Sequence, residues 1–257
     1  MTFFGMFRYK IRMLFRKFGY DITPIYDKNE LKDLTDIEFD LINSVKKYTL
    51  TSPQRMHALM ESVKHIVENK IEGSIVECGV WKGGSMMLVS QTLKKLNHTG
   101  YDLYLYDTFE GTTKPSEVDL DYMGNSMLNA WNKEFEGKKK LPSSADYASI
   151  EEVQKNIFMT GYPKNKIHFI KGRVEETIPS HIPEKISILR LDTDWYESTK
   201  HELEYLFPRL SSGGILIIDD YGHFKGAKKA VDEYFKKNEI KSFIHRIDYT
   251  GRLVVKL

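Results

Sequence analysis

The chain lacks several features that would assign its class at once. It has one cysteine, Cys78, in 257 residues, so no disulfide can form within it and a cytoplasmic location is the simplest expectation. No apolar run approaches ~18 residues, and the amino end has no signal-peptide apolar core, so we expect neither a membrane-spanning helix nor a leader.

The chain also lacks a large excess of either charge. Its 38 lysines and arginines against 36 acids give a formal net charge of +2, whereas a general nucleic-acid-binding protein is usually far more basic. With 41% apolar residues, the chain can bury one sizeable core. We therefore expect one domain, residues 35–257, after a separate segment, residues 1–34.

That first segment is basic and amphipathic. Residues 1–20 hold five lysines and arginines, no acid, and many aromatic and aliphatic side chains. Two interpretations stay open: peripheral contact with the inner membrane surface, or packing against the domain itself or a second subunit of a homo-oligomer.

Two β-branched runs, residues 186–191 and 215–218, each end on acids. The acids are Asp192, Asp194, Asp219 and Asp220. In a parallel α/β sheet such runs are buried strands, and the residues at their carboxyl ends line the ligand crevice. In an extended chain, Asp192 and Asp194 point to the same side. All four carboxylates are therefore expected to meet at one edge of the sheet.

Something must cancel the repulsion among these acids. Neighbouring strands lie about 4.8 Å apart, and two like charges at about 4 Å cost about 4 kcal/mol at an effective dielectric of about 20. Protonation, pairing with Arg190 on the same face as Asp192, or a hard divalent cation would each relieve it. We favour the cation, and an all-oxygen ligand set favours magnesium, manganese or calcium over zinc.

Residues 73–85 predict a strand, a glycine-rich turn and the start of a helix. Gly79, Gly83 and Gly84 allow close backbone approach, and a helix starting near Ser85 offers free N–H groups. The spacing lacks the middle glycine of a dinucleotide fingerprint. The acid Glu77 at the strand end suits a cationic group on the ligand.

A second strand, residues 103–107, ends on Asp107, which is placed to accept hydrogen bonds from ribose hydroxyls. Phe109 follows, and it either flanks an adenine or belongs to the core. A third strand, residues 167–171, opens into a turn at Gly172. Residues 112–147 are too long for a structureless loop in a compact domain, so we expect a partly helical lid or acceptor-site insertion.

Helix signals precede the first strand. Thr35 and Glu38 form a capping box that starts a helix running to about residue 48. Ser52 with Pro53 starts a second helix, and Arg55 in its first turn either only builds that helix or forms part of a lid. We expect residues 211–214 to end a later helix, and residues 242–257 to form a hairpin. The fold class is α/β, a doubly wound, mostly parallel sheet with an antiparallel edge strand.

Four motifs together resemble one family. They are Glu-Cys-Gly-Val-Trp-Lys-Gly-Gly-Ser at 77–85, Asp-Thr-Phe-Glu-Gly at 107–111, Leu-Asp-Thr-Asp-Trp-Tyr-Glu-Ser-Thr at 191–199 and Ile-Asp-Asp-Tyr-Gly at 218–222. Over roughly residues 50–257 the chain resembles class I S-adenosylmethionine-dependent methyltransferases, and more narrowly the macrocin O-methyltransferase (TylF/MycF) family. The resemblance implies a seven-stranded Rossmann-like sheet, S-adenosyl-L-methionine and Mg²⁺ or Mn²⁺ as cofactors, and methylation of a hydroxyl on a sugar or glycosylated small molecule.

The resemblance also implies roles for residues. The metal ligands would be Asp192, Asp219 and Asp220. The residues around the cofactor would be Glu77, Cys78, Gly79, Val80, Gly83, Gly84, Ser85, Asp107, Thr108, Phe109 and Gly172. Where the family commonly has glycine between the two acids of the fourth strand, this chain has Thr193, which narrows the site.

The predicted mechanism needs a base for the acceptor hydroxyl. Asp194 or Asp192 is the expected base, with His223 as the alternative because its ordinary pKa suits neutral pH. Four aromatic residues are candidates for stacking on the acceptor: Trp131, Trp195, Tyr196 and Tyr221. The rival functions are a nicotinamide-dependent oxidoreductase and a non-catalytic nucleoside-binding scaffold.

Overall fold

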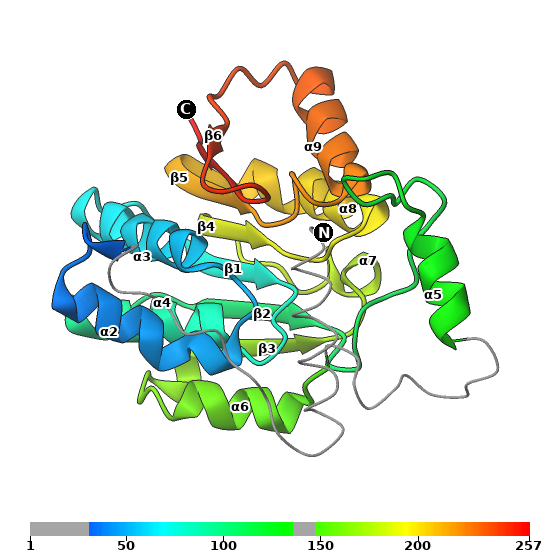
Figure 1. Ribbon diagram of the computed structural model, residues 1–257. Coiled ribbons are helices and arrows are strands. Elements are labelled where there is room, and N and C mark those ends of the chain that lie inside the picture. The colour runs from blue at the N-terminus through cyan, green and yellow to red at the C-terminus, as the bar shows by residue number, and fades with distance from the viewer. Residues whose placement is uncertain (1–30, 136–146) are drawn as a thin grey trace.

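The computed structural model describes residues 31–135 and 147–257, and it forms a sheet with helices on both faces (Figure 1). Nearly all of the basic first segment lies outside the described residues, as does the lysine-rich part of the insertion. The predictions made for those stretches are therefore left as predictions.

The sheet has seven strands: β1 Ser74–Cys78, β2 Leu103–Asp107, β3 Ile167–Lys171, β4 Ile186–Leu191, β5 Leu210–Ile218, β6 His245–Arg246 and β7 Arg252–Val255. Their order is β3-β2-β1-β4-β5-β7-β6, and β7 is antiparallel to both of its neighbours, β5 and β6. The predicted fold class is confirmed. Strand order reverses between β1 and β4, so the crevice expected for a ligand opens at their carboxyl ends.

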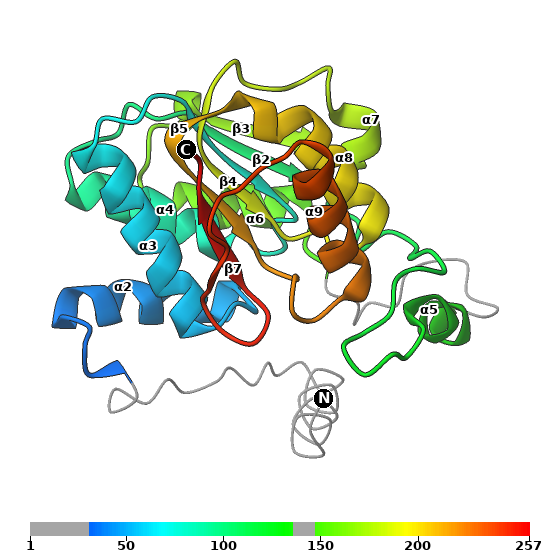
Figure 2. The same ribbon diagram turned by 90° about the horizontal axis from the view of Figure 1, so that it is seen from above.

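Helices cover both faces of this sheet (Figure 2). The larger are α2 Asp36–Val45, α3 Pro53–Glu68, α4 Gly84–Lys95, α5 Met127–Phe135, α6 Ile150–Phe158, α7 Val174–Thr177, α8 Tyr196–Leu206 and α9 Lys225–Lys237, and short 3-10 turns are η2 Lys46–Tyr48, η3 Lys164–Lys166 and η4 Phe207–Arg209. One buried cluster packs α2, α3, α4 and α6 on one face, and another packs α7, α8 and α9 on the other. None of the helices within the described residues is long and apolar enough to cross a bilayer.

Local signals position most element boundaries correctly. The Thr35 capping box and the Ser52 cap with Pro53 are both present. Residues 211–214, which were expected to end the preceding helix, instead belong to β5. The pairing of β4 with β5 shifts register near Ile186, and Gly213, with φ of 77°, is part of the irregularity. A glycine inside a strand often marks such a bulge. In the sequence alone, a glycine that makes a bulge looks the same as a glycine that makes a turn.

The capping box supports a pH-dependent prediction. A hydrogen bond from Lys64 lowers the pKa of Glu38 to about 2, and Glu38 also accepts the Thr35 N–H at 2.8 Å. Glu38→Gln should lower the free energy of unfolding by about 1 kcal/mol at pH 7. Because the folded pKa is depressed, this stabilisation is present above the ordinary pKa of about 4.5 and is lost as pH falls toward 2.

Urea unfolding at pH 7 and pH 3 measures both variants. The control is Glu61→Gln, since Glu61 also contacts Lys64 but its side chain is 48% exposed; its effect should be smaller at both pH values. If Glu38→Gln lowered the free energy of unfolding by the same amount at pH 3 and at pH 7, the stabilising role of the ionised Glu38 carboxylate would be contradicted.

Candidate functional site

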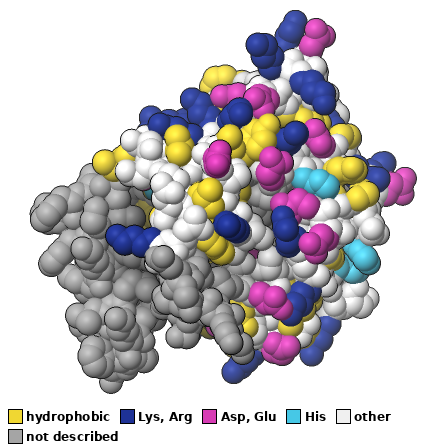
Figure 3. Space-filling view, turned by 90° about the vertical axis from the view of Figure 1, so that its right-hand side faces the viewer, with side chains coloured by type: hydrophobic (Ala, Val, Ile, Leu, Met, Phe, Trp, Pro, Cys, Tyr) yellow, Lys and Arg dark blue, Asp and Glu magenta, His cyan; other side chains and the backbone are white. Residues whose placement is uncertain are grey.

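A cavity of about 510 Å³ opens at the carboxyl ends of β1, β2, β4 and β5, within the usual size range for a small-molecule site. Its wall combines the turn after β1, the strand-end acids, the first turn of α3 and the tip of the β6–β7 hairpin. On the face shown in Figure 3, acidic, basic and hydrophobic side chains are intermixed, and the described residues form no broad area of one charge.

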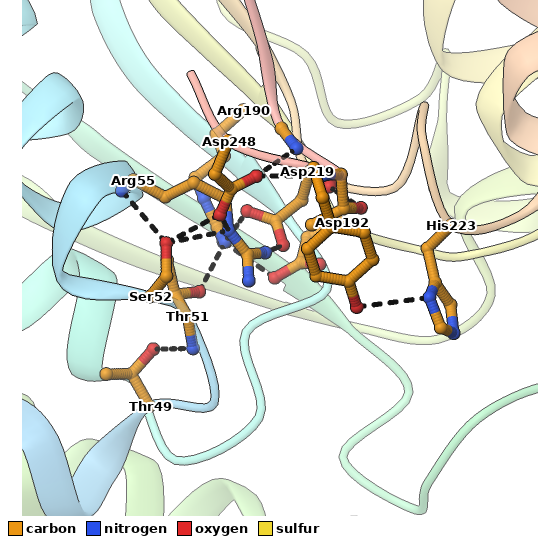
Figure 4. A network of polar contacts seen from close by, with 12 residues as sticks. Thr49, Thr51, Ser52, Arg55, Arg190, Asp192, Asp219, His223 and Asp248 are labelled. Carbon is orange, nitrogen blue, oxygen red and sulfur yellow. Dashed lines mark hydrogen bonds and ion pairs between the residues drawn. The ribbon is translucent and has the colours of Figure 1, made fainter. Parts of the chain in front are cut away.

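Arg190 lies at the centre of the strand-end acids. It is 3% exposed, and its guanidinium pairs with Glu77, with Asp192 at 2.8 Å and with Asp219. Arg55, from the first turn of α3, also pairs with Asp219 (Figure 4). The pairing of Arg190 with Asp192, which was the alternative to the favoured cation, is present, and Asp219 is paired with two arginines.

The remaining acids stay crowded despite these arginines. Asp192, Asp194 and Asp220 each offer a carboxylate oxygen, and these oxygens all lie within 4.8 Å of one another. Burial, and next the charge of Asp192, raise the pKa of Asp220 to about 7. Asp219 lies outside this group of three, so its predicted role as a metal ligand stays a prediction.

A tight turn brings Asp194 to the cluster. Strand β4 ends at Leu191, Asp194 has φ of 69°, and the Trp195 N–H donates to the Thr193 carbonyl at 2.8 Å. A hydrogen bond that spans one residue of positive φ is the pattern of a γ-turn, which is strained for a non-glycine residue. The extended chain assumed from the sequence is therefore wrong at Asp194, although the two acids still converge.

The glycine-rich turn after β1 is held tightly. Gly79 has φ of 83°, and a Cβ atom there would clash with the Asp192 carbonyl oxygen. The Asp107 carboxylate accepts the N–H groups of Val80 at 2.6 Å, Trp81 at 3.1 Å and Phe109 at 2.7 Å. Asp107 thus ties the end of β2 to the turn after β1, while it also lines the cavity.

The predicted cofactor residues separate into two groups. Those lining the cavity are Gly79, Val80, Ser85, Asp107, Thr108 and Gly172. Four of the others are packing residues. Glu77 is 1% exposed and pairs with Arg190, and Cys78 and Phe109 lie in the core. Phe109 thus matches the core interpretation, and its adenine-flanking role stays a prediction. A Cβ atom on Gly84 would meet the Tyr48 backbone.

Gly83 is the fifth residue outside that lining. It caps α4 with φ of 86°, a conformation that glycine adopts without strain. Its role is therefore to start the helix.

An aromatic wall, which we define as Tyr122, His223 and Tyr249, was not predicted. His223 Nδ1 lies 3.2 Å from the Tyr249 hydroxyl, and the Tyr122 and His223 ring centroids are 5.5 Å apart. His223 and Tyr249 line the cavity. The missed signal was Gly222, where a Cβ atom would clash with the Tyr249 carbonyl oxygen, so the hairpin tip packs on the loop after β5.

The aromatic residues chosen from the sequence lie elsewhere. Trp195 is buried and its Nε1 donates to the Thr113 carbonyl at 2.8 Å. Tyr196 and Tyr221 donate their hydroxyls to acids of α9, and neither these three nor Trp131 contributes to the cavity wall. The stacking roles proposed for them are not supported.

The described part of the insertion is anchored beside the cavity. Asp119 is fully buried and accepts the N–H of Tyr196, at the start of α8, at 2.8 Å. Thr112 and Thr113 contribute to the cavity wall. A lid function for the insertion stays a prediction.

Comparison with known proteins identifies the family. The family model described as Macrocin-O-methyltransferase (TylF) matches residues 31–256. The chain belongs to this family. The family resemblance predicted from the four motifs is thereby confirmed, and the protein is an O-methyltransferase rather than an oxidoreductase or a scaffold.

Three similar proteins are informative. This chain is 31% identical to the 8-demethyl-8-(2,3-dimethoxy-alpha-L-rhamnosyl)-tetracenomycin-C 4'-O-methyltransferase of Streptomyces olivaceus, over 79% of this chain and 74% of that one. It is 29% identical to the mycinamicin III 3''-O-methyltransferase of Micromonospora griseorubida, over 79% and 76%. The solved structure of the O-methyltransferase NovP superposes with a TM-score of 0.70 at 27% identity, covering 81% and 82%.

Proposed function

We propose that this protein transfers a methyl group from S-adenosylmethionine to a sugar hydroxyl of a glycosylated small molecule, with a divalent metal ion bound at the strand-end acids. The observation that carries the proposal is the convergence of Asp192, Asp194 and Asp220 within 4.8 Å beside the cavity. The names of two relatives, which methylate a rhamnosyl tetracenomycin and mycinamicin III, support the acceptor class.

The cofactor would occupy the end of the cavity formed by the turns after β1, β2 and β3. When bound, S-adenosylmethionine supplies an electrophilic methyl group on a positively charged sulfur. Gly79 lets the backbone approach it closely, and Asp107 and Thr108 are placed for the ribose hydroxyls. The acids of the cavity wall favour a cationic ligand.

The residues present fit a hard divalent cation. Asp192 and Asp220 are the ligands we propose, because their oxygens converge and an all-carboxylate set suits magnesium or manganese. Asp219 is the third predicted ligand, and binding through it requires an oxygen to leave Arg55 or Arg190. When bound, the ion makes a coordinated sugar hydroxyl more acidic and fixes its position.

The base we propose is Asp194. Its carboxylate would accept the proton of the acceptor hydroxyl as the methyl group passes to the hydroxyl oxygen, which leaves S-adenosylhomocysteine. Asp192 is less suited because one of its oxygens pairs with Arg190 at 2.8 Å. His223 is the alternative: burial lowers its pKa, so the ring is neutral at pH 7 and can accept a proton.

The aromatic wall supports an acceptor with an apolar face. Tyr249 is 56% exposed and Tyr122 is 41% exposed, and both rings flank His223 at the acid end of the cavity. Tyr249→Ala should raise the acceptor KM about 3- to 10-fold, with kcat nearly unchanged, because ring contacts are worth about 0.5–1.5 kcal/mol. Tyr249→Phe keeps the ring but loses the hydroxyl bond to His223; a KM increase equal to that of Tyr249→Ala would contradict stacking.

A radiolabelled methyl-transfer screen tests the function. Free sugars, nucleotide sugars and glycosides would each be assayed with and without Mg²⁺ after treatment with a chelator. We expect product only with a glycoside and a divalent ion. Full activity in the chelator would refute the metal requirement, and transfer only to non-sugar acceptors would refute the acceptor class.

A further inference from the structure

The turn that presents Asp192 and Asp194 is held from behind by a buried acid of α8. Glu202 is fully buried, and it accepts a hydrogen bond from the Thr193 hydroxyl at 2.9 Å. Thr193 stands between the two cluster acids in the sequence. This contact therefore acts on the one residue that links them.

The turn needs such support because its backbone is strained. Asp194 has φ of 69°, and a strained non-glycine residue persists only where the surrounding structure holds it. Ser198 of α8 donates to the Thr193 carbonyl at 3.3 Å and to the Trp195 carbonyl at 3.2 Å. Helix α8 thus holds Thr193 through its side chain and its backbone together.

Glu202 is unusual for a residue whose only role is packing. Its second carboxyl oxygen, Oε2, is buried and has no partner among the described residues apart from a contact of this carboxyl with the Cys78 thiol, and a buried polar group without a strong hydrogen bond lowers stability. Burial raises the pKa of Glu202 well above its ordinary value, and the charges of Glu175, Asp192 and Asp220 raise it further. The raised pKa favours the neutral form of Glu202, and in that form it holds Thr193 without adding a charge to the crowded acids.

We propose that Glu202 is a positioning residue for the metal site: its hydrogen bond to Thr193 fixes the turn that aims Asp192 and Asp194 at Asp220. The inference rests on the proposed function, because it assigns the purpose of the turn to metal binding.

Matched variants separate the hydrogen bond from packing. Glu202→Gln keeps an acceptor oxygen and the size of the side chain. Glu202→Leu and Thr193→Val each remove one half of the bond with little change in volume. The double variant, Thr193→Val with Glu202→Leu, tests coupling, because residues that act through one contact give non-additive effects.

The first readout is Mn²⁺ affinity, measured by calorimetry on the full chain. Loss of a group that orients metal ligands weakens metal binding about 10- to 100-fold. We expect that loss in Glu202→Leu and Thr193→Val, no further loss in the double variant, and affinity near the starting value in Glu202→Gln. Affinity for S-adenosylhomocysteine should stay unchanged in all four, which checks that each variant is folded.

The second readout is hydrogen exchange of the backbone amides of residues 194–198 in metal-free protein. Faster exchange in Glu202→Leu, with normal exchange in Glu202→Gln, is expected whether or not metal binds. If the unchanged protein binds no Mn²⁺ but this pattern appears, the metal function fails while the positioning of the turn stands. Unchanged exchange and unchanged Mn²⁺ affinity in Glu202→Leu would overturn the inference.

Discussion

Asp220→Asn is expected to lower kcat/KM for methyl transfer about 100- to 1,000-fold, the usual cost of removing one electrostatic group from a reacting centre. The substitution keeps the shape of the side chain but removes a charge and a hard ligand oxygen from the cluster of Asp192, Asp194 and Asp220. Asp220 is only 8% exposed, although it lines the cavity, so its carboxylate is held in place by the surrounding chain. Binding of S-adenosylhomocysteine should be nearly unchanged, because Asp220 lies at the acid end of the cavity.

The matched control is Asp232→Asn on α9, where the carboxylate accepts the Tyr221 hydroxyl at 2.6 Å on the exposed surface. That variant should keep full activity. Equal activity of Asp220→Asn and the unchanged protein, with and without a chelator, would contradict the role proposed for the acid cluster.

The variant Asp219→Asn tests whether Asp219 binds the metal ion or only pairs with the two arginines. If Asp219 binds the ion, the variant loses Mn²⁺ affinity. If it serves only Arg55 and Arg190, the variant loses stability while Mn²⁺ affinity is kept. Calorimetry with Mn²⁺ and urea unfolding of the same preparation separate the two outcomes.

Arg190→Met is expected to lower the free energy of unfolding by about 3–5 kcal/mol, the cost of removing one partner from a buried ion pair. Arg190 is 3% exposed and holds Glu77, Asp192 and Asp219 together. Without its guanidinium, carboxylates on three neighbouring strand ends face one another in a buried place. Arg190→Lys should recover part of the loss, because one ammonium group cannot reproduce the fork of a guanidinium.

The loss in Arg190→Met should depend on pH. Burial raises the pKa of Glu77 to about 7 even with Arg190 present. In the folded variant, the acids that lose their arginine can take up protons, which relieves their repulsion, and at pH 5 this uptake is more complete than at pH 8. The difference in the free energy of unfolding between the unchanged protein and Arg190→Met should therefore grow from pH 5 to pH 8.

Urea unfolding at both pH values, without added metal, makes the measurement. Arg209→Met is the control, since Arg209 donates to backbone carbonyls of the loop before β4. A deficit below about 1 kcal/mol for Arg190→Met, as for an exposed pair, would show that the acids do not depend on this arginine.

The fold was predictable because its signals are local. Strands such as β2 and β3 are short apolar runs between turn residues, and their bounds were predicted correctly. The start of β5 was not predicted correctly, because Gly213 lies in a β-bulge within the strand and not in a turn. The antiparallel hairpin was predicted from the Tyr249 to Gly251 turn, but its tip was not expected at the cavity.

The site was predicted only in part because its geometry depends on side-chain partners distant in sequence. The convergence of acids followed from strand order alone. The neutralisation of Asp219 depends on Arg55, which is 164 positions away, and the packing of Glu202 against Thr193 depends on the direction of a helix. Phe109, with φ of 51°, lies in the core, and no spacing rule predicts that turn.

Anomalous diffraction from crystals grown with Mn²⁺ and S-adenosylhomocysteine tests the central claim most directly. The account predicts one strong peak in contact with carboxylate oxygens of Asp192 and Asp220, on the side of the cavity that carries Tyr249. A map with no peak there at saturating Mn²⁺, with these acids paired only to arginine or separated from one another, would contradict it.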